Sequence, residues 1–317
     1  LTSKFNIDFN LVLNIIASRP NKTSCLEEVV EFTKKSMMND EIQKELKQTE
    51  KILEQLTEKK TSKSLEKLSF QTKQQDIDSY LEMKNRITMV KPKQRKKLSR
   101  EIAELESANK KIIKESEKII EIHNIDREIF KTQERIQEIN FYISNIVKNV
   151  VNILSDTKHL ELCCETQNLV LTTKGLIAAN IQEVHGLAFA DALFELQDDT
   201  LREISVDELA SVFSCFTGIK VSDMYQDGYI KTTNENIKKM IKHLEDNYNK
   251  YSDIESKNKL CTYFDYHMSY DMINSTLEWC NADTEQEAKQ IIHNIAEQKD
   301  LFIGEFIKMI LKINNIA

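Results

Sequence analysis

The chain has 317 residues, enough for two or three domains, and its formal net charge is −7. This acidic balance excludes a uniformly basic nucleic-acid coat but is compatible with a local basic track. Because only 5 glycines and 2 prolines are available for turns, the composition predicts a mainly helical protein.

Three features of the sequence predict where the protein is located and whether it is part of a longer chain: its cysteines, its apolar runs and the two ends of the chain. The six cysteines include no CxxC pair, and none lies near a histidine at metal-ligand spacing. This pattern predicts reduced thiols in an intracellular protein, nuclear or cytoplasmic. No run of 18 apolar residues occurs, so we expect no membrane span. The first residues have no initiator Met and no signal sequence, and a helical pattern runs to Ala317; we therefore expect a piece of a longer chain.

The first forty residues predict two short helices. Residues 5–17 carry apolar side chains at helical spacing, and Pro20 ends this helix because it disfavours helical backbone at Arg19. A second helix is predicted from about Ser24.

A heptad pattern begins at Ile42 and is typical of a narrow coiled-coil seam. Residues 57–64 interrupt it with charged and small polar side chains, and helical character resumes over 77–87. The seam of this first segment consists of Ile42, Leu46, Thr49, Leu53 and Leu56.

A second heptad segment is predicted as one long helix from Leu98 to Ile153, with a phase shift between Ile119 and Ile122. Two heptad segments joined by a break favour an antiparallel helical hairpin. A continuous dimeric coiled coil is the alternative.

The break between the segments is basic. Lys91 to Arg100 contains six basic residues and no acidic one, and its candidate phosphate-binding residues are Lys93, Arg95, Lys96 and Lys97. One interpretation is a solvated helix end. The other is a phosphate-binding tip, since six like charges gain little from one another without a polyanion.

After Leu160 the apolar period changes to about two. Leu160 and Leu162, then Leu169 and Leu171, flank a polar centre, which predicts a short hairpin. A helix is predicted over 176–181. Helices, hairpin and helix in this order fit a small winged-helix unit.

The C-terminal part predicts a compact helical bundle. Capping boxes at Ser205 and Thr284 each precede a helix, and further helices are predicted over 237–251 and around Trp279. The last helix is predicted from Leu301. Its expected inward residues are Phe302, Ile303, Phe306, Ile307, Ile310 and Leu311.

The chain contains no nucleotide-binding loop and no hydrolase motif, so we expect no catalytic residue and no metal site within it. Lys308 and Lys312 lie four residues apart on the last helix. They form either a solvated helix side or a face that touches single-stranded nucleic acid.

Several stretches resemble the DSHCT region of the exosome-assisting DExH-box RNA helicases of the superkiller and nuclear TRAMP type. The family's Leu-Thr-x-Lys-Gly-x-x-Ala motif is matched by residues 171–178. Its acidic residue before a Phe resembles Asp191 with Phe194, and its Leu-Ser-Cys-Phe segment resembles residues 213–216. Trp279 resembles a buried family Trp, and residues 5–16 resemble the exit of the second RecA-like domain.

The resemblance implies an architecture. Residues 1–20 would leave a RecA-like motor domain, and 21–41 with 141–185 would form a winged-helix-like unit. Residues 42–140 would be the arch or stalk, without the family's β-rich head, and 186–317 a truncated DSHCT-like bundle. The last helix would be the ratchet helix, which places Lys308 and Lys312 at RNA. Lys220 stands where the family has an acidic residue that bears on base preference.

The implied function is the C-terminal accessory region of an ATP-dependent RNA helicase that unwinds RNA in the 3′–5′ direction. ATP and Mg²⁺ would bind motor domains outside this chain, and the fragment itself would hold no cofactor. The expected partners are single-stranded RNA, those motor domains and an exosome-like complex.

Two rivals from other classes stand beside this interpretation. One is a non-enzymatic coiled-coil adaptor with a helical docking bundle, and the other is a DNA-binding winged-helix regulator. Richness in Ile, Lys and Asn is typical of an AT-rich genome such as that of a virus or a protist.

Overall fold

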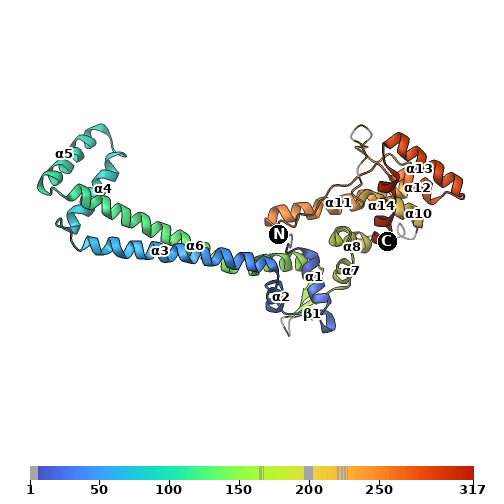
Figure 1. Cartoon of the computed structure of the whole chain (residues 1–317), viewed down its shortest axis with the longest axis horizontal. Helices are drawn as coiled ribbons and strands as arrows, with labels where there is room; N and C mark the ends of the chain where they lie inside the picture. Colours follow the sequence, from blue (N-terminus) through green and yellow to red (C-terminus); the bar gives the residue numbers. More distant parts are fainter. Residues whose placement is uncertain are drawn as a thin grey trace. The chain divides into compact units, whose positions relative to one another are not determined.

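The computed structural model describes residues 6–163, 166, 168–195, 203–219, 221, 222, 224, 226 and 228–317, without the side chain of Met37. It is mainly helical, which confirms the predicted fold class (Figure 1). The chain divides into two compact units: unit 1 comprises 1–36 and 143–317, and unit 2 comprises 37–142. The finer domain assignments made from the sequence stay predictions.

Unit 2 is built on two long antiparallel helices, α3 (Met37–Lys67) and α6 (Ile112–Asp156), the latter continuing into unit 1. Figure 1 shows the two helices side by side. Ion pairs join them, and residues later in α3 pair with residues earlier in α6, as antiparallel helices require. These pairs are Glu45–Arg135 at 2.7 Å, Lys60–Asp126 at 2.7 Å, Lys63–Glu121 at 3.0 Å and Glu66–Lys118 at 2.7 Å. The described chain therefore pairs its own two heptad segments.

Residues 57–64 do not interrupt α3, so that part of the prediction is wrong. The hydroxyls of Thr57 and Thr61 donate to the carbonyls of Leu53 and Thr57 four residues earlier, at 2.8 and 2.9 Å. Polar side chains that bond back to their own helix can be accommodated on its surface. Lys60 and Lys63 meanwhile face carboxylates of α6.

The predicted second long helix is two helices, α5 (Pro92–Ala108) and α6, and α4 (Gln74–Ile87) packs against α5. The reason for the break is a separate small core, made of Ile77, Tyr80, Ile102, Ile112 and Ile119. Ile102 and Ile112 can both reach it only if the chain reverses at 109–111. We call residues 68–111 the head; it lies at the end of the α3–α6 pair (Figure 1).

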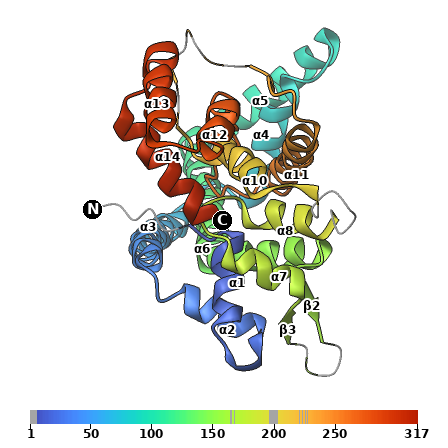
Figure 2. The same cartoon turned by 90° about the vertical axis from the view of Figure 1, so that its right-hand side faces the viewer.

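Unit 1 begins with α1 (Phe9–Ala17), a 3₁₀ turn (Pro20–Lys22), β1 (Thr23–Ser24) and α2 (Leu26–Thr33). The predicted hairpin is present as β2 (Leu160–Leu162) and β3 (Leu169–Leu171), followed by α7 (Thr173–Asn180). β1, which was not predicted, pairs antiparallel with β3 and completes a sheet of order β1-β3-β2 beside α1 and α7 (Figure 2). The winged-helix assignment stays a prediction.

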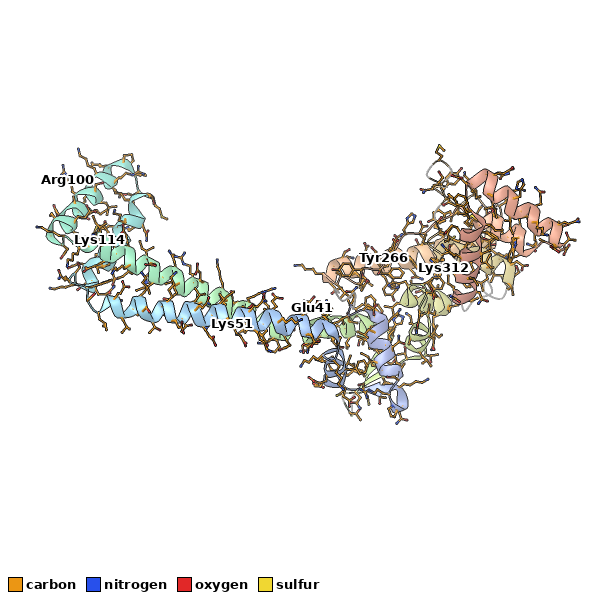
Figure 3. All side chains as sticks on the ribbon, in the orientation of Figure 1. Glu41, Lys51, Arg100, Lys114, Tyr266 and Lys312 are labelled. Atoms are coloured by element: carbon orange, nitrogen blue, oxygen red, sulfur yellow. The ribbon has the colours of Figure 1, made fainter. Side chains whose placement is uncertain are left out.

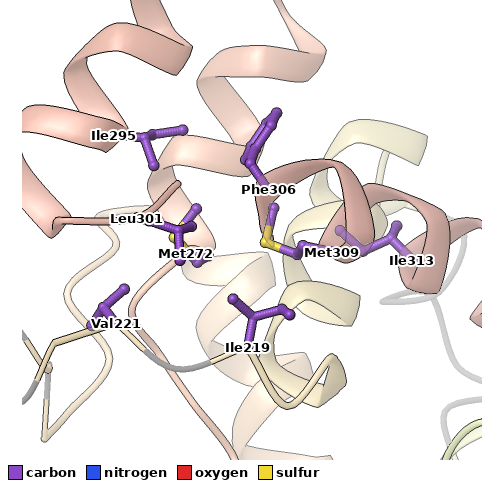
Figure 4. Packing of buried hydrophobic residues seen from close by; sticks show 8 residues of the cluster. All are labelled: Ile219, Val221, Met272, Ile295, Leu301, Phe306, Met309 and Ile313. Atoms are coloured by element: carbon purple, nitrogen blue, oxygen red, sulfur yellow. The ribbon is translucent and has the colours of Figure 1, made fainter. Parts of the chain in front are cut away.

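The remaining helices of unit 1 are α8 (Gly186–Glu195), α10 (Val206–Phe213), α11 (Glu235–Asn258), α12 (Ile273–Cys280), α13 (Glu285–Lys299) and α14 (Ile303–Ile316). Both predicted capping boxes form, Ser205 with Glu208 and Thr284 with Glu287. A core packs around Ile219 and Met272, the residue before α12, with Ile295 from α13 (Figure 4). The α14 side chains in it are Phe306, Met309 and Ile313. Across the described residues, no helix is long and apolar enough to cross a membrane.

Candidate nucleic-acid interface and its supporting cluster

The face that α14 buries agrees only in part with the predicted one: Phe306 is buried as predicted, and Ile310 packs partly buried against the core. Phe306, Met309 and Ile313 are 7% exposed or less and point into the core around Met272 and Ile219 (Figure 4). Phe302, Ile303, Ile307 and Leu311, predicted to point inward, are 51–80% exposed. Apolar side chains occur on more than one side of this helix, so the pattern alone could not choose the buried side.

The two lysines of α14 are in different environments. Lys308 is exposed, and among the described residues it pairs with Glu305 alone, on its own helix, at 2.6 Å. Lys312, labelled in Figure 3, lies near the end of α14. Its Nζ donates to the carbonyl of Thr217 at 2.6 Å and so joins α14 to the turn after α10. Lys308 is therefore free to exchange its partner for a phosphate, whereas Lys312 also has a structural contact.

The basic run opens α5, where Pro92 occupies the first turn. Lys93, Arg95, Lys96 and Lys97 are all exposed; Arg95 donates through Nε to the Ile87 carbonyl at 3.1 Å, and Lys97 lies 3.7 Å from Glu101. Positive charge at a helix N-terminus is unfavourable because it opposes the helix dipole. An anion would relieve this. Lys220, the remaining candidate, lies outside the described residues.

The Leu-Thr-x-Lys-Gly stretch has a clear local structure. Thr172 caps α7 by accepting from the Gly175 amide at 3.0 Å, and its own hydroxyl donates to the Lys158 carbonyl at 2.9 Å. A Cβ at Gly175 would overlap the His159 carbonyl. The glycine thus lets α7 lie directly against the backbone that precedes β2.

Lys174 of the same stretch forms a salt bridge with Asp191 of α8 and donates to the Thr157 carbonyl at 3.1 Å. Asp191 is fully buried and accepts two more bonds, from Lys250 at 2.7 Å and from the Tyr251 hydroxyl at 2.9 Å. Burial acts to raise the pKa of Asp191, but the hydrogen bonds from the two lysines outweigh it and lower the pKa overall. Asp191 therefore stays ionised and joins α7, α8 and α11.

Two buried histidines lie beside this cluster. His159 Nε2 is 3.4 Å from Asp191 Oδ1, and burial lowers the pKa of His159 to about 4 although the carboxylate acts to raise it. Burial, together with His159, lowers the pKa of His185 to about 3. Both imidazoles are therefore neutral at physiological pH.

His185 belongs to a hydrogen-bonded chain that the sequence analysis missed. Its Nδ1 accepts from the Ala188 amide at 3.2 Å, and its Nε2 lies 3.1 Å from the Tyr266 hydroxyl. Tyr266 in turn donates to buried Glu255 at 2.8 Å. The groups are far apart in sequence, and no local pattern could have grouped them. Tyr266 is labelled in Figure 3.

Clusters of potential metal ligands and cysteines are two further kinds of candidate site to consider in the described part of the chain. No group of three His, Cys, Asp or Glu side chains there could hold a metal ion. The backbone amide of His267 donates to Asp265, as in an ordinary turn. Cys25, Cys215, Cys261 and Cys280 are free thiols.

The C-terminal part of the chain is similar to a known domain family. Residues 168–317 match the family described as the DSHCT (NUC185) domain, which is a little under half of the chain. This domain is associated with Ski2-like RNA helicases, which supports a helicase accessory role. The match includes Lys174, Asp191, the 260–270 segment and α14. No curated protein matches the chain.

Proposed function

We propose that this chain is the C-terminal accessory region of an ATP-dependent RNA helicase. It would complete the channel for single-stranded RNA and couple ATP hydrolysis in motor domains outside the chain to 3′–5′ unwinding. The observation that carries the proposal is the DSHCT match over 168–317, which ends on α14 with Lys308 exposed. ATP and Mg²⁺ would be bound by the motor domains, and an exosome-like complex is the proposed larger partner.

Two surfaces would touch RNA under this proposal. On α14, Lys308 and Lys312 would contact phosphates or bases of the threaded strand. On the head, Lys93, Arg95, Lys96 and Lys97 would hold phosphates at the start of α5. The chain's negative net charge makes such local basic surfaces the sites where a polyanion would bind.

The coiled-coil adaptor is the rival function. Dimerisation through the heptad seam would have to replace the ion pairs that join α3 to α6 within the chain, such as Lys60–Asp126. This observation favours the helicase proposal over an adaptor that dimerises through its stalk.

RNA binding by the 317-residue chain tests the proposal. Affinity for an oligouridine strand would be measured over a salt series for the wild type, Lys308→Ala, and the quadruple alanine variant of Lys93, Arg95, Lys96 and Lys97. Each lost phosphate contact should weaken binding and make the salt slope of log K shallower by about 0.7. Lys289→Ala is the matched control, because Lys289 is an exposed lysine paired with Glu285 on α13. Equal binding by all four proteins would contradict both surfaces.

A further inference from the structure

A small polar cavity of about 220 Å³ lies in unit 1 where three segments meet. The segments are the start of α1 with Asn10, the turn before α8 with Gln182 and His185, and an extended segment carrying Thr262, Tyr263 and Phe264. All three belong to the same compact unit. Its lining includes no residue of α14 and no lysine or arginine.

The extended segment, residues 260–270, is fixed by alternating side chains. The hydroxyl of Thr262 donates to the Glu255 carboxylate at 2.7 Å, and the hydroxyl of Tyr266 donates to the same carboxylate. Between them, the ring of Phe264 packs against the imidazole of His185, with the ring centroids 4.9 Å apart. The intervening residues Cys261, Tyr263, Asp265 and His267 are exposed. Thr262, Phe264 and Tyr266 thus fix the segment at every second residue.

Tyr263 stands out among the exposed residues. Its side chain is 78% exposed, and its backbone has φ of 58°, a left-handed conformation that is uncommon for a bulky residue. Such a conformation costs about 1–3 kcal/mol and persists where neighbouring contacts fix it. The contacts of Thr262 and Phe264 on either side provide this. The result is an aromatic ring held at the edge of a polar cavity.

The polar groups of the cavity are suited to an uncharged ligand. The Asp8 carboxylate already accepts from the Leu11 amide, and both ring nitrogens of His185 are engaged. Within the described part of the chain, the amides of Asn10 and Gln182 make no side-chain hydrogen bond, so they can both donate and accept. A phosphate would meet Asp8 here and no lysine or arginine.

We propose that this cavity binds a single nucleobase of the RNA strand, which stacks on Tyr263 and is hydrogen-bonded by Asn10 and Gln182. This rests on the proposed function, since it assumes an RNA ligand. The cavity is smaller than the roughly 300–1,000 Å³ typical of drug-sized ligands, which limits it to one small planar group. Aromatic stacking combined with side-chain amides is how proteins recognise unpaired bases.

The test uses the 317-residue chain and an oligouridine strand with one 2-aminopurine, whose fluorescence falls when the base stacks on an aromatic ring. Tyr263→Gly removes the ring and places at this position a residue that adopts positive φ without strain, and its melting temperature is measured to confirm that the variant folds. Its affinity should fall roughly 5- to 150-fold, the range expected for one base–aromatic stack. Tyr263→Phe should keep both affinity and quenching.

Tyr229→Ala is the matched control, because Tyr229 is also an exposed tyrosine, 66% accessible, on another segment of unit 1. Loss of quenching in Tyr263→Gly but not in Tyr229→Ala supports the base site. If Tyr263→Gly binds and quenches as the wild type does, the base site is wrong and the proposed function stands. If the wild type binds no RNA at low salt, the proposed function fails and the base site fails with it.

Discussion

Lys174 of α7 and Asp191 of α8 form a salt bridge in which the carboxylate is fully buried and the lysine side chain is 18% exposed. Lys174 precedes the glycine that lets α7 approach the His159 carbonyl, and Asp191 also holds Lys250 and Tyr251 of α11. One carboxylate therefore joins the helix after the hairpin to two helices of the C-terminal bundle. We infer that Lys174 and Gly175 of the Leu-Thr-x-Lys-Gly stretch serve the architecture of unit 1.

Asp191→Asn should lower the free energy of unfolding of unit 1 by about 3–5 kcal/mol, because it leaves the buried end of Lys174 without a counter-charge. Lys250→Ala should cost far less, at most about 1 kcal/mol, since the Lys250 side chain is 42% exposed and solvent screens its interaction. Urea unfolding followed by circular dichroism measures both. Equal losses in the two variants would show that Asp191 acts through something other than its buried charge.

Gly175→Ala should destabilise the chain by roughly 1–3 kcal/mol or more, because the new methyl group overlaps a backbone carbonyl that cannot move aside easily. Gly304→Ala is the matched substitution on α14, where nothing lies within 4 Å of the added Cβ. It should stabilise the helix by about 0.5–1 kcal/mol. Thermal unfolding of the two variants should therefore shift in opposite directions.

Stability should fall as the pH drops below about 6.5. His159 and His185 have folded pKa values of about 4 and 3, below the ordinary value of 6.5, so the unfolded chain binds more protons in this range. Each histidine contributes a slope of up to about 1.4 kcal/mol per pH unit. Carboxylates titrate mainly at lower pH, which makes pH 5–6.5 the diagnostic window.

Unfolding free energies at several pH values measure this slope. His185→Phe should reduce the slope by up to about 1.4 kcal/mol per pH unit, because one proton fewer is taken up on unfolding. The phenyl ring still fits the aromatic cluster, so the variant should fold. A slope that is the same in wild type and His185→Phe would mean that His185 is not neutral in the folded protein.

Local signals in the sequence predicted the local structure well. The capping boxes at Ser205 and Thr284 involve residues three apart, and the β2–β3 hairpin follows from alternation over a few residues. Such features depend on neighbours in the chain, so a single sequence contains the necessary information.

Contacts between residues that lie far apart in the sequence could not be predicted in the same way. Asp191 forms ion pairs with Lys174 and Lys250. The chain has 44 lysines and arginines, and only the packing of α7, α8 and α11 determines that these two lysines lie next to the Asp191 carboxylate. At 109–111 the sequence offers Asn109 as a turn signal but no glycine or proline, so the end of α5 is only weakly marked. The head exists because Ile102, Ile112 and Ile77 share a core, which is a tertiary property.

Glu115 provides a test of how the head is held. Its side chain is buried near the start of α6, and its two oxygens accept the backbone amides of Gln71 at 2.9 Å and Thr72 at 3.1 Å. Burial acts to raise the pKa of Glu115, but hydrogen bonds from Thr72 and Gln71 lower it overall, so the carboxylate is charged at neutral pH. Hydrogen bonds to a charged acceptor contribute about 1.5–3 kcal/mol.

Glu115→Gln replaces one of these acceptor oxygens with an amide NH₂, which cannot accept, so one backbone amide before α4 loses its partner. Hydrogen exchange of amides in 68–111 should accelerate roughly 10- to 150-fold, while exchange in unit 1 stays the same. Glu117→Gln is the control, as Glu117 is exposed two residues further along α6. Acceleration in both variants, or in neither, would show that the bonds of Glu115 do not hold the entry to α4, and the small apolar core around Ile77 would then be sufficient to fix the head.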